Sequence, residues 1–131
     1  MTYQILDQVN AYLLSKITPY ASIYNEVFPG VTAKEIMSRT DPGEYNETRY
    51  MDRSRIGQFN FSYYCKSDDM EEAREQLGEI IDALDLPVMT QITDVTQVKI
   101  EPVTSPTWIQ KTEKNEFVYT ASLRLEYFKG V

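Results

Sequence analysis

Two features of the 131-residue sequence could carry chemistry: its single cysteine, Cys65, and a group of carboxylates just after it. A cysteine becomes a nucleophile when a neighbouring base removes its proton. The sequence contains no histidine, the commonest such base and the commonest metal ligand. Cys65 also alternates with Phe59, Phe61 and Tyr63 along a predicted strand, so we expect it to be a buried, unreactive core side chain.

The carboxylates of Asp68, Asp69, Glu71 and Glu72 could in principle hold a metal ion. Their position in the first turn of a predicted helix explains them equally well, because the helix dipole favours negative charge there. The sequence contains no phosphate-binding loop, dinucleotide fingerprint, zinc motif or nucleophile elbow. We therefore expect no catalytic, cofactor-binding or metal-binding residues, and we interpret the chain as a binding or assembly module.

The acidic composition disfavours a nucleic-acid binder. The chain has 20 Asp and Glu residues against 13 Lys and Arg residues, a net charge of −7, whereas contacts to phosphates need clustered positive charge. No apolar run is long enough to span a bilayer, and the N-terminus lacks the features of a signal peptide. We expect one domain over residues 1–131, made in the cytoplasm, with no specific nucleic-acid binding and no membrane partner.

The elements that must position any functional surface are clearest at the C-terminal end. From Phe117 to Tyr127 every odd residue is apolar and most even residues are polar, which is the period of a strand with one buried face. Eleven such residues would span roughly 36 Å, far longer than an average strand. A sheet with so long a member presents a broad polar face, and such a face suits a protein partner.

The rest of the pattern predicts two amphipathic helices and further strands. The helices are expected over residues 2–17 and 68–84, and the segment 32–40 fits a capped helix or a short strand about equally well. The other strands are expected over residues 20–28, 55–66, 95–103 and 107–111. Successive strands favour hairpins, so we predict an α+β two-layer sandwich: a largely antiparallel sheet with both helices packed on one face.

Residues 39–55 depart from this regular pattern. They contain eight charged residues of both signs together with Pro42 and Gly43, which predicts a solvent-exposed loop or an extended hairpin. The segment could simply be solvated, or it could contact a neighbouring subunit. On the second interpretation the candidate subunit-interface residues are Arg49, Asp52, Arg53 and Arg55.

Tyrosines are numerous, ten in all, and pairs such as Tyr63-Tyr64 and Tyr127-Phe128 put aromatic rings on both faces of a strand. Exposed tyrosines are common at protein interfaces. The same pairs would also fit a second sheet face that is covered by the chain's own loops.

Three stretches resemble a known family: Tyr50–Ser67 (YMDRSRIGQFNFSYYCKS), the helix end Ile81–Leu84 (IDAL) and Glu116–Tyr127 (EFVYTASLRLEY). Together they are similar to the minor capsid or tail terminator group of long-tailed bacteriophages and prophages, over about residues 1–129. Members of this group tend to have Asp-Gly-Ser where this chain has Asp52-Arg53-Ser54. Arginine forgoes the easy positive φ of glycine, so we expect a turn of different shape here.

The resemblance implies an α+β subunit that assembles with copies of itself into a ring, typically of six. Such a ring sits on the end of the tail tube, stops the growth of the tube and presents a surface to the head connector proteins. It implies a virion structural protein, assembled in the cytoplasm of the bacterial host, with no catalytic residues. Two alternatives remain: another head–tail joining or completion protein, and a small α+β ligand-binding domain or enzyme with its pocket between helices and sheet.

Overall fold

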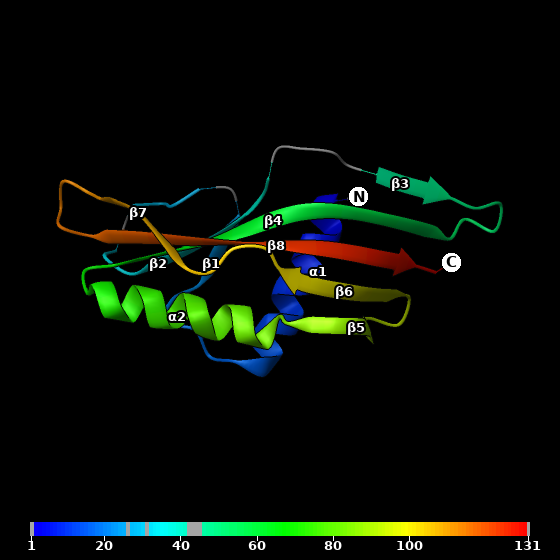
Figure 1. The fold of residues 1–131 in the computed structure, drawn as a ribbon, viewed down its shortest axis with the longest axis horizontal. Helices are drawn as coiled ribbons and strands as arrows, with labels where there is room; N and C mark the ends of the chain where they lie inside the picture. Colours follow the sequence, from blue (N-terminus) through cyan, green and yellow to red (C-terminus); the bar gives the residue numbers. More distant parts are fainter. Residues whose placement is uncertain (1, 26, 31, 42–45, 131) are drawn as a thin grey trace.

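The computed structural model describes residues 2–25, 27–30, 32–41 and 46–130. Within them, an eight-stranded sheet forms one layer and two helices form the other, covering one face of the sheet (Figure 1). All strand pairs are antiparallel except one at the edge. The predicted α+β two-layer architecture is therefore confirmed.

Two strands of thirteen residues each, β4 (Arg55–Ser67) and β8 (Phe117–Lys129), form the centre of the sheet. They pair antiparallel along their whole length, from Arg55 opposite Lys129 to Ser67 opposite Phe117. Their alternation is as predicted, since one face of both strands is buried in the core. The buried residues on this face are Phe59, Phe61, Tyr63, Cys65, Tyr119, Ala121, Leu123, Leu125 and Tyr127.

Shorter strands flank this pair on both sides. Strands β2 (Glu35–Thr40) and β3 (Asn46–Arg49) pair, one after the other, with the edge of β4 that faces away from β8. Strands β6 (Thr96–Pro102) and β7 (Thr107–Lys111) do the same along β8. The sheet is completed at its two edges by β1 (Ile23–Asn25), parallel to β2, and β5 (Leu86–Gln91), antiparallel to β6.

Helices α1 (Thr2–Lys16) and α2 (Met70–Ala83) pack on the apolar face of the sheet. The side chain of Asp69 caps α2 by accepting a hydrogen bond from the amide of Glu71 at 3.0 Å, so this carboxylate belongs to the helix start as predicted. The buried stripe of α2 consists of Ala73, Leu77, Ile80 and Ile81, with Leu84 just beyond the helix. Met70, the first residue of α2, is exposed.

The structure differs from three of the predicted elements and decides one that the sequence left open. The strand predicted over residues 20–28 is limited to Ile23–Asn25, because Tyr20 is held by side-chain contacts instead of strand pairing: its amide bonds Gln76 Oε1 and its hydroxyl bonds the Lys66 carbonyl. Within the ambiguous segment 32–40, Glu35–Thr40 forms strand β2, so the short-strand alternative is the one observed. Strand β5 was not predicted; its Pro87 is tolerated because an edge strand can lack one pairing amide. Strands β6 and β7 do not form a hairpin, since each pairs with β8.

Candidate subunit interface

The charged segment over residues 39–55 contains a hairpin. Its first two residues complete β2, residues 42–45 lie outside the described residues, and β3 returns antiparallel to β4 with Arg49 opposite Arg55. The connecting turn is closed by a hydrogen bond from the Tyr50 amide to the Ser54 carbonyl at 2.9 Å. A second bond runs from the Arg53 amide to the Tyr50 carbonyl at 3.0 Å. The turn lies at one end of the long axis of the molecule (Figure 1).

Of the four candidate interface residues, Asp52 shapes the turn. Its carboxylate accepts the hydroxyl of Ser54 at 2.6 Å and the amide of Ser54 at 3.0 Å. These two hydrogen bonds stabilise the charged form and hold the pKa of Asp52 below its usual value. Asp52 therefore serves the local structure of the hairpin first, because its carboxylate bonds the residue two positions further along the turn, Ser54.

Arg49 and Arg55 come together around Glu47, a residue that the sequence analysis did not single out. The Nε of Arg49 lies 2.9 Å from Glu47 Oε1, and a guanidinium nitrogen of Arg55 lies 4.0 Å from the same oxygen. The other carboxylate oxygen of Glu47 accepts the hydroxyl of Tyr127. Only 6% of the Glu47 side chain is exposed, so both arginines stabilise a nearly buried carboxylate.

The contact between Glu47 and Tyr127 follows from the strand register. Glu47 is opposite Gly57 on β4, and Gly57 is opposite Tyr127 on β8, so the three residues form one row across the sheet. Directly opposed residues share a face, and the glycine places no side chain between the other two. The sequence signal that could have revealed this contact is a lone glycine within an alternating strand.

Arg53 is the candidate that the fold leaves free for another use. Its φ is 72°, in the left-handed region, so arginine adopts the conformation that the sequence analysis expected it to avoid. In the part of the chain that the structure describes, Arg53 makes no ion pair. Beside it the turn carries Tyr50, which is half exposed, and Met51, which is fully exposed. Arginine, tyrosine and methionine are all enriched at protein interfaces.

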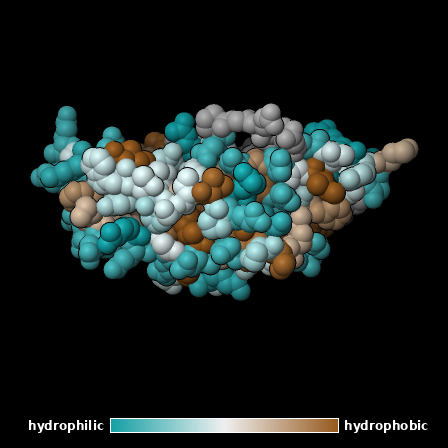
Figure 2. Space-filling model, in the orientation of Figure 1, coloured by the Kyte–Doolittle hydropathy of each residue, from teal (hydrophilic) through white to brown (hydrophobic). Residues whose placement is uncertain are grey.

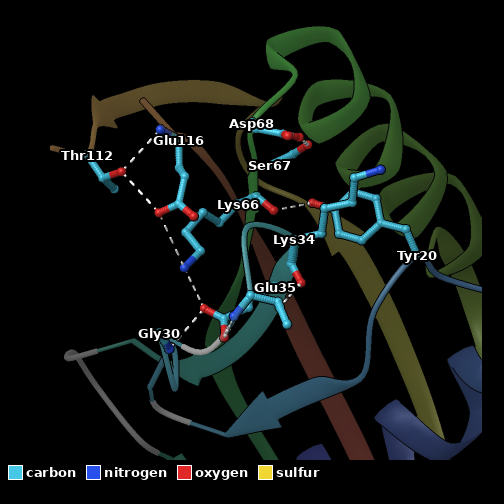
Figure 3. A network of polar contacts seen from close by, with 10 residues as sticks. Tyr20, Gly30, Lys34, Glu35, Lys66, Ser67, Asp68, Thr112 and Glu116 are labelled. Carbon is cyan, nitrogen blue, oxygen red and sulfur yellow. Dashed lines mark hydrogen bonds and ion pairs between the residues drawn. The ribbon is translucent and has the colours of Figure 1, made fainter. Parts of the chain in front are cut away.

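A second polar cluster lies at the other end of β4, and the sequence analysis missed it. The ammonium group of Lys66 is 2.5 Å from Glu35 on β2 and 3.7 Å from Glu116 at the start of β8 (Figure 3). It also lies 5.4 Å from the centre of the Phe28 ring. All three charged residues are buried. A buried charge is costly unless it is paired, so this cluster ties together the three segments that supply it.

The two carboxylates extend the cluster into neighbouring loops. Glu35 accepts hydrogen bonds from the amides of Gly30 and Thr32, at 3.1 and 3.5 Å. Glu116 accepts the hydroxyl of Thr112 at 3.1 Å and donates its own amide to that hydroxyl oxygen, also at 3.1 Å, which closes the turn between β7 and β8 (Figure 3). This cluster is a structural clamp, and it fixes the first residue of β2: Glu35 is opposite Lys66 in the strand register and binds its ammonium group.

Comparison with known proteins agrees with the resemblance found in the sequence. The family model described as "Bacteriophage tail terminator protein" matches residues 16–128. The chain belongs to this family. A tail terminator is a structural component of the virion, and its role lies in completion of the tail. The sequence also resembled minor capsid proteins, and that assignment remains a prediction.

Among solved structures, one similar chain comes from the "Virion of native gene transfer agent (GTA) particle". It is 14% identical to this tail terminator, with a TM-score of 0.44, and the match covers 95% of this chain and 91% of that chain. No curated protein sequence matches the chain.

The residues that could carry chemistry in this tail terminator are used structurally. Cys65 is buried, and burial raises its pKa to about 12, so its thiol stays protonated near neutral pH. No three His, Cys, Asp or Glu side chains among the described residues are placed to hold a metal ion. None of the described helices is long and apolar enough to cross a membrane.

The face of the sheet away from the helices is the polar surface predicted from β8. Gln58 and Asn60 on β4 oppose Glu126 and Arg124 on β8, and these residues line a shallow hollow of about 260 Å³. Arg124 is exposed and Glu126 is half-buried. Such a surface can form hydrogen bonds with a protein partner. The charges of Arg124 and Glu126 cancel, so these residues give it no net charge.

Proposed function

We propose that this tail terminator assembles with copies of itself into a ring, of six as the resemblance implies, and caps the end of the tail tube. The ring stops the growth of the tube and offers its other side to the head connector proteins. The observation that carries the proposal is the family match, which spans residues 16–128. The role is structural and not catalytic, and we place assembly in the host cytoplasm.

Two structural features support a ring subunit. The paired strands β4 and β8 give the molecule a long, stiff axis, with the β3–β4 hairpin at one end and α2 toward the other (Figure 1). Distinct surfaces at opposite ends allow each subunit to contact the next head to tail, which closes a ring when the rotation fits.

The test is complementation of a phage of this type from which the gene for the chain has been deleted. Supplied in trans, the chain should restore tails of uniform length and infectious particles, whereas the deletion alone should give overlong tubes. Negative-stain electron microscopy measures the lengths. Uniform tails without the protein, combined with heads that fail to attach, would instead place the chain among the other head–tail joining proteins. An unchanged phenotype on deletion would refute both roles.

A further inference from the structure

The charge of the molecule is concentrated on one element. Between Asp68 and Asp85, which covers α2 and its two ends, the chain carries eight carboxylates and one arginine, a net charge of −7. The other 12 carboxylates equal the other 12 Lys and Arg residues, so the rest of the chain is neutral. In Figure 2 hydrophilic side chains, with some apolar ones among them, lie along the lower edge of the molecule, where Figure 1 shows α2.

The acidic residues form a stripe that costs the isolated subunit stability. Glu72, Glu75, Glu79 and Asp82 follow each other at steps of three and four residues, so they lie along one side of the helix. Like charges at this spacing destabilise a helix by roughly 0.2–0.5 kcal/mol per pair. Glu72 bonds Lys34 at 2.7 Å, but the other three make no ion pair with any described residue.

The stripe also contains a hollow with an unmet hydrogen-bond donor. A depression of about 230 Å³ lies between α2 and the segment before β1, lined by Thr18, Tyr20, Glu72, Glu75, Gln76 and Glu79. Gln76 is only 7% exposed; its Oε1 accepts the amide of Tyr20 at 2.9 Å, and its Nε2 has no hydrogen-bond partner. Buried amide groups nearly always have a partner, so the unpaired Nε2 indicates that an acceptor is missing.

The complementary surface is the tip of the β3–β4 hairpin. The backbone of Arg53 is in the left-handed region, which glycine would adopt with less strain, yet the residue there carries a cationic side chain. Backbone strain of this kind persists where a side chain has a use. The tip also presents the exposed side chain of Met51 and the half-exposed Tyr50. Within one chain the hairpin tip and α2 lie toward opposite ends of the long axis (Figure 1), so their contact requires two copies.

We infer that the hairpin tip of one subunit docks on α2 of the next, with the Arg53 guanidinium in the hollow between Glu75 and Glu79. The guanidinium fits two carboxylates in a fork geometry, and a peptide carbonyl of the tip supplies the acceptor for Gln76 Nε2. The contact is heterologous, so its repetition generates a ring when the rotation between neighbouring subunits closes. This inference rests on the proposed function and names the subunit surfaces that it uses.

A charge swap tests the contact. Arg53→Glu should abolish the oligomer, and so should Glu75→Arg with Glu79→Arg, because each change puts like charges together. Combining all three in one chain should restore the oligomer, since the charges are exchanged and not lost. Light scattering over a protein concentration series measures the mass of the complex. Matched controls are Lys114→Glu for the hairpin and Asp94→Arg with Glu113→Arg for the helix, which change the charge equally elsewhere and should leave the mass unchanged.

A cross-link makes the test independent of weak association. Arg53→Cys and Glu75→Cys in one chain should give a ladder of disulfide-linked copies on oxidation, and Lys114→Cys with Glu75→Cys should not. The inference is wrong if the reversed variants keep the oligomer, if the combined variant stays dissociated, or if no ladder forms. Reversals in α2 that leave the oligomer intact but block DNA delivery would show that the stripe lines the channel instead. Tail length in complementation scores the proposed function separately, so the function can stand while the contact fails.

Discussion

Arg53 occupies a backbone position where its own side chain is a disadvantage to the fold, with φ at 72°. Arg53→Gly should stabilise the monomer by about 0.5–1 kcal/mol, because relief of the left-handed conformation outweighs the greater freedom of glycine in the unfolded chain. Urea unfolding measures the change. Arg53→Ala is the control, since it keeps the strained φ and should bring no gain. If glycine stabilises no more than alanine, the strain argument fails.

Arg49 and Arg55 cannot be tested as simply. Both lie against the nearly buried Glu47, so reversing their charge would surround that carboxylate with like charges and weaken the fold itself. A loss of assembly after such a change would not identify an interface. Among the candidate interface residues, Arg53 therefore gives the cleanest test, because in the described structure it makes no ion pair.

The buried thiol of Cys65 should make the protein sensitive to alkali. Its pKa is raised to about 12 in the folded state, against about 8.5 in an unfolded chain. The folded state thus keeps a proton that the unfolded state releases, and the free energy of unfolding should fall as the pH rises through this window. Burial also raises the pKa of Tyr20 and Tyr63, which adds to the loss above about pH 10. Unfolding curves near neutral pH and at about pH 10.5 measure it.

The control for this prediction is Cys65→Ala, which should lose less stability than the parent between the two pH values. Thiol labelling provides the second measurement. Cys65 should react with a thiol reagent only in denaturant, because a protonated and inaccessible thiol is a poor nucleophile. Rapid labelling of the native protein would show that the side chain is not buried.

Among the elements, β8 contributes most to the core because it pairs with β4, β6 and β7. Leu123 and Leu125 are completely buried, so replacing either with alanine should cost about 2–5 kcal/mol through lost burial and the cavity left behind. Arg124 lies between them on the opposite, exposed face, and Arg124→Ala should change stability by less than about 0.5 kcal/mol. Equal melting temperatures for all three variants would mean that the buried face is assigned wrongly.

The Lys66 clamp joins β4 to β2 and to the turn before β8, so its removal should lower the stability of the whole fold. Lys66→Ala should destabilise the protein by about 3–5 kcal/mol, because it leaves two buried carboxylates without their cation. Lys34→Ala removes a solvent-exposed ion pair with Glu72 and should cost much less stability, because solvent screens such a pair. Chemical denaturation of both variants makes the comparison, and similar losses would show that the cluster is not effectively buried.

At the scale of the whole molecule, the separation of charge predicts how assembly responds to salt. Contacts between exposed charges weaken as the Debye length falls from about 10 Å at 0.1 M salt to about 3 Å at 1 M. Raising the salt over this range should therefore dissociate the proposed ring at a given protein concentration, while the fold of each subunit stays intact. Sedimentation velocity follows the mass and circular dichroism follows the fold. An oligomer that tightens with salt would point to an apolar interface.

The sequence by itself determined the elements whose pattern is local. The alternation of β4 and β8 and the apolar stripe of α2 are patterns of residues close together along the chain, so periodicity was enough to predict them. The family could also be recognised from these stretches. Of the candidate interface, the sequence identified a charged segment and its four residues, but it could not separate their roles.

The tertiary structure decided what depends on segments distant in the chain. Strand β1 is short, and β6 and β7 both pair with β8. Both facts depend on which strand lies next to each segment in the folded chain. The contacts of Glu47 with Tyr127 and of Lys66 with Glu35 could not be predicted, because the residues of each pair are far apart in the chain and the sheet brings them together. The fold also decides that α2, with its acidic stripe, and the hairpin tip lie toward opposite ends of one molecule (Figure 1). The burial of a charge and its position in space are properties of the packed chain, and a one-dimensional pattern does not contain them.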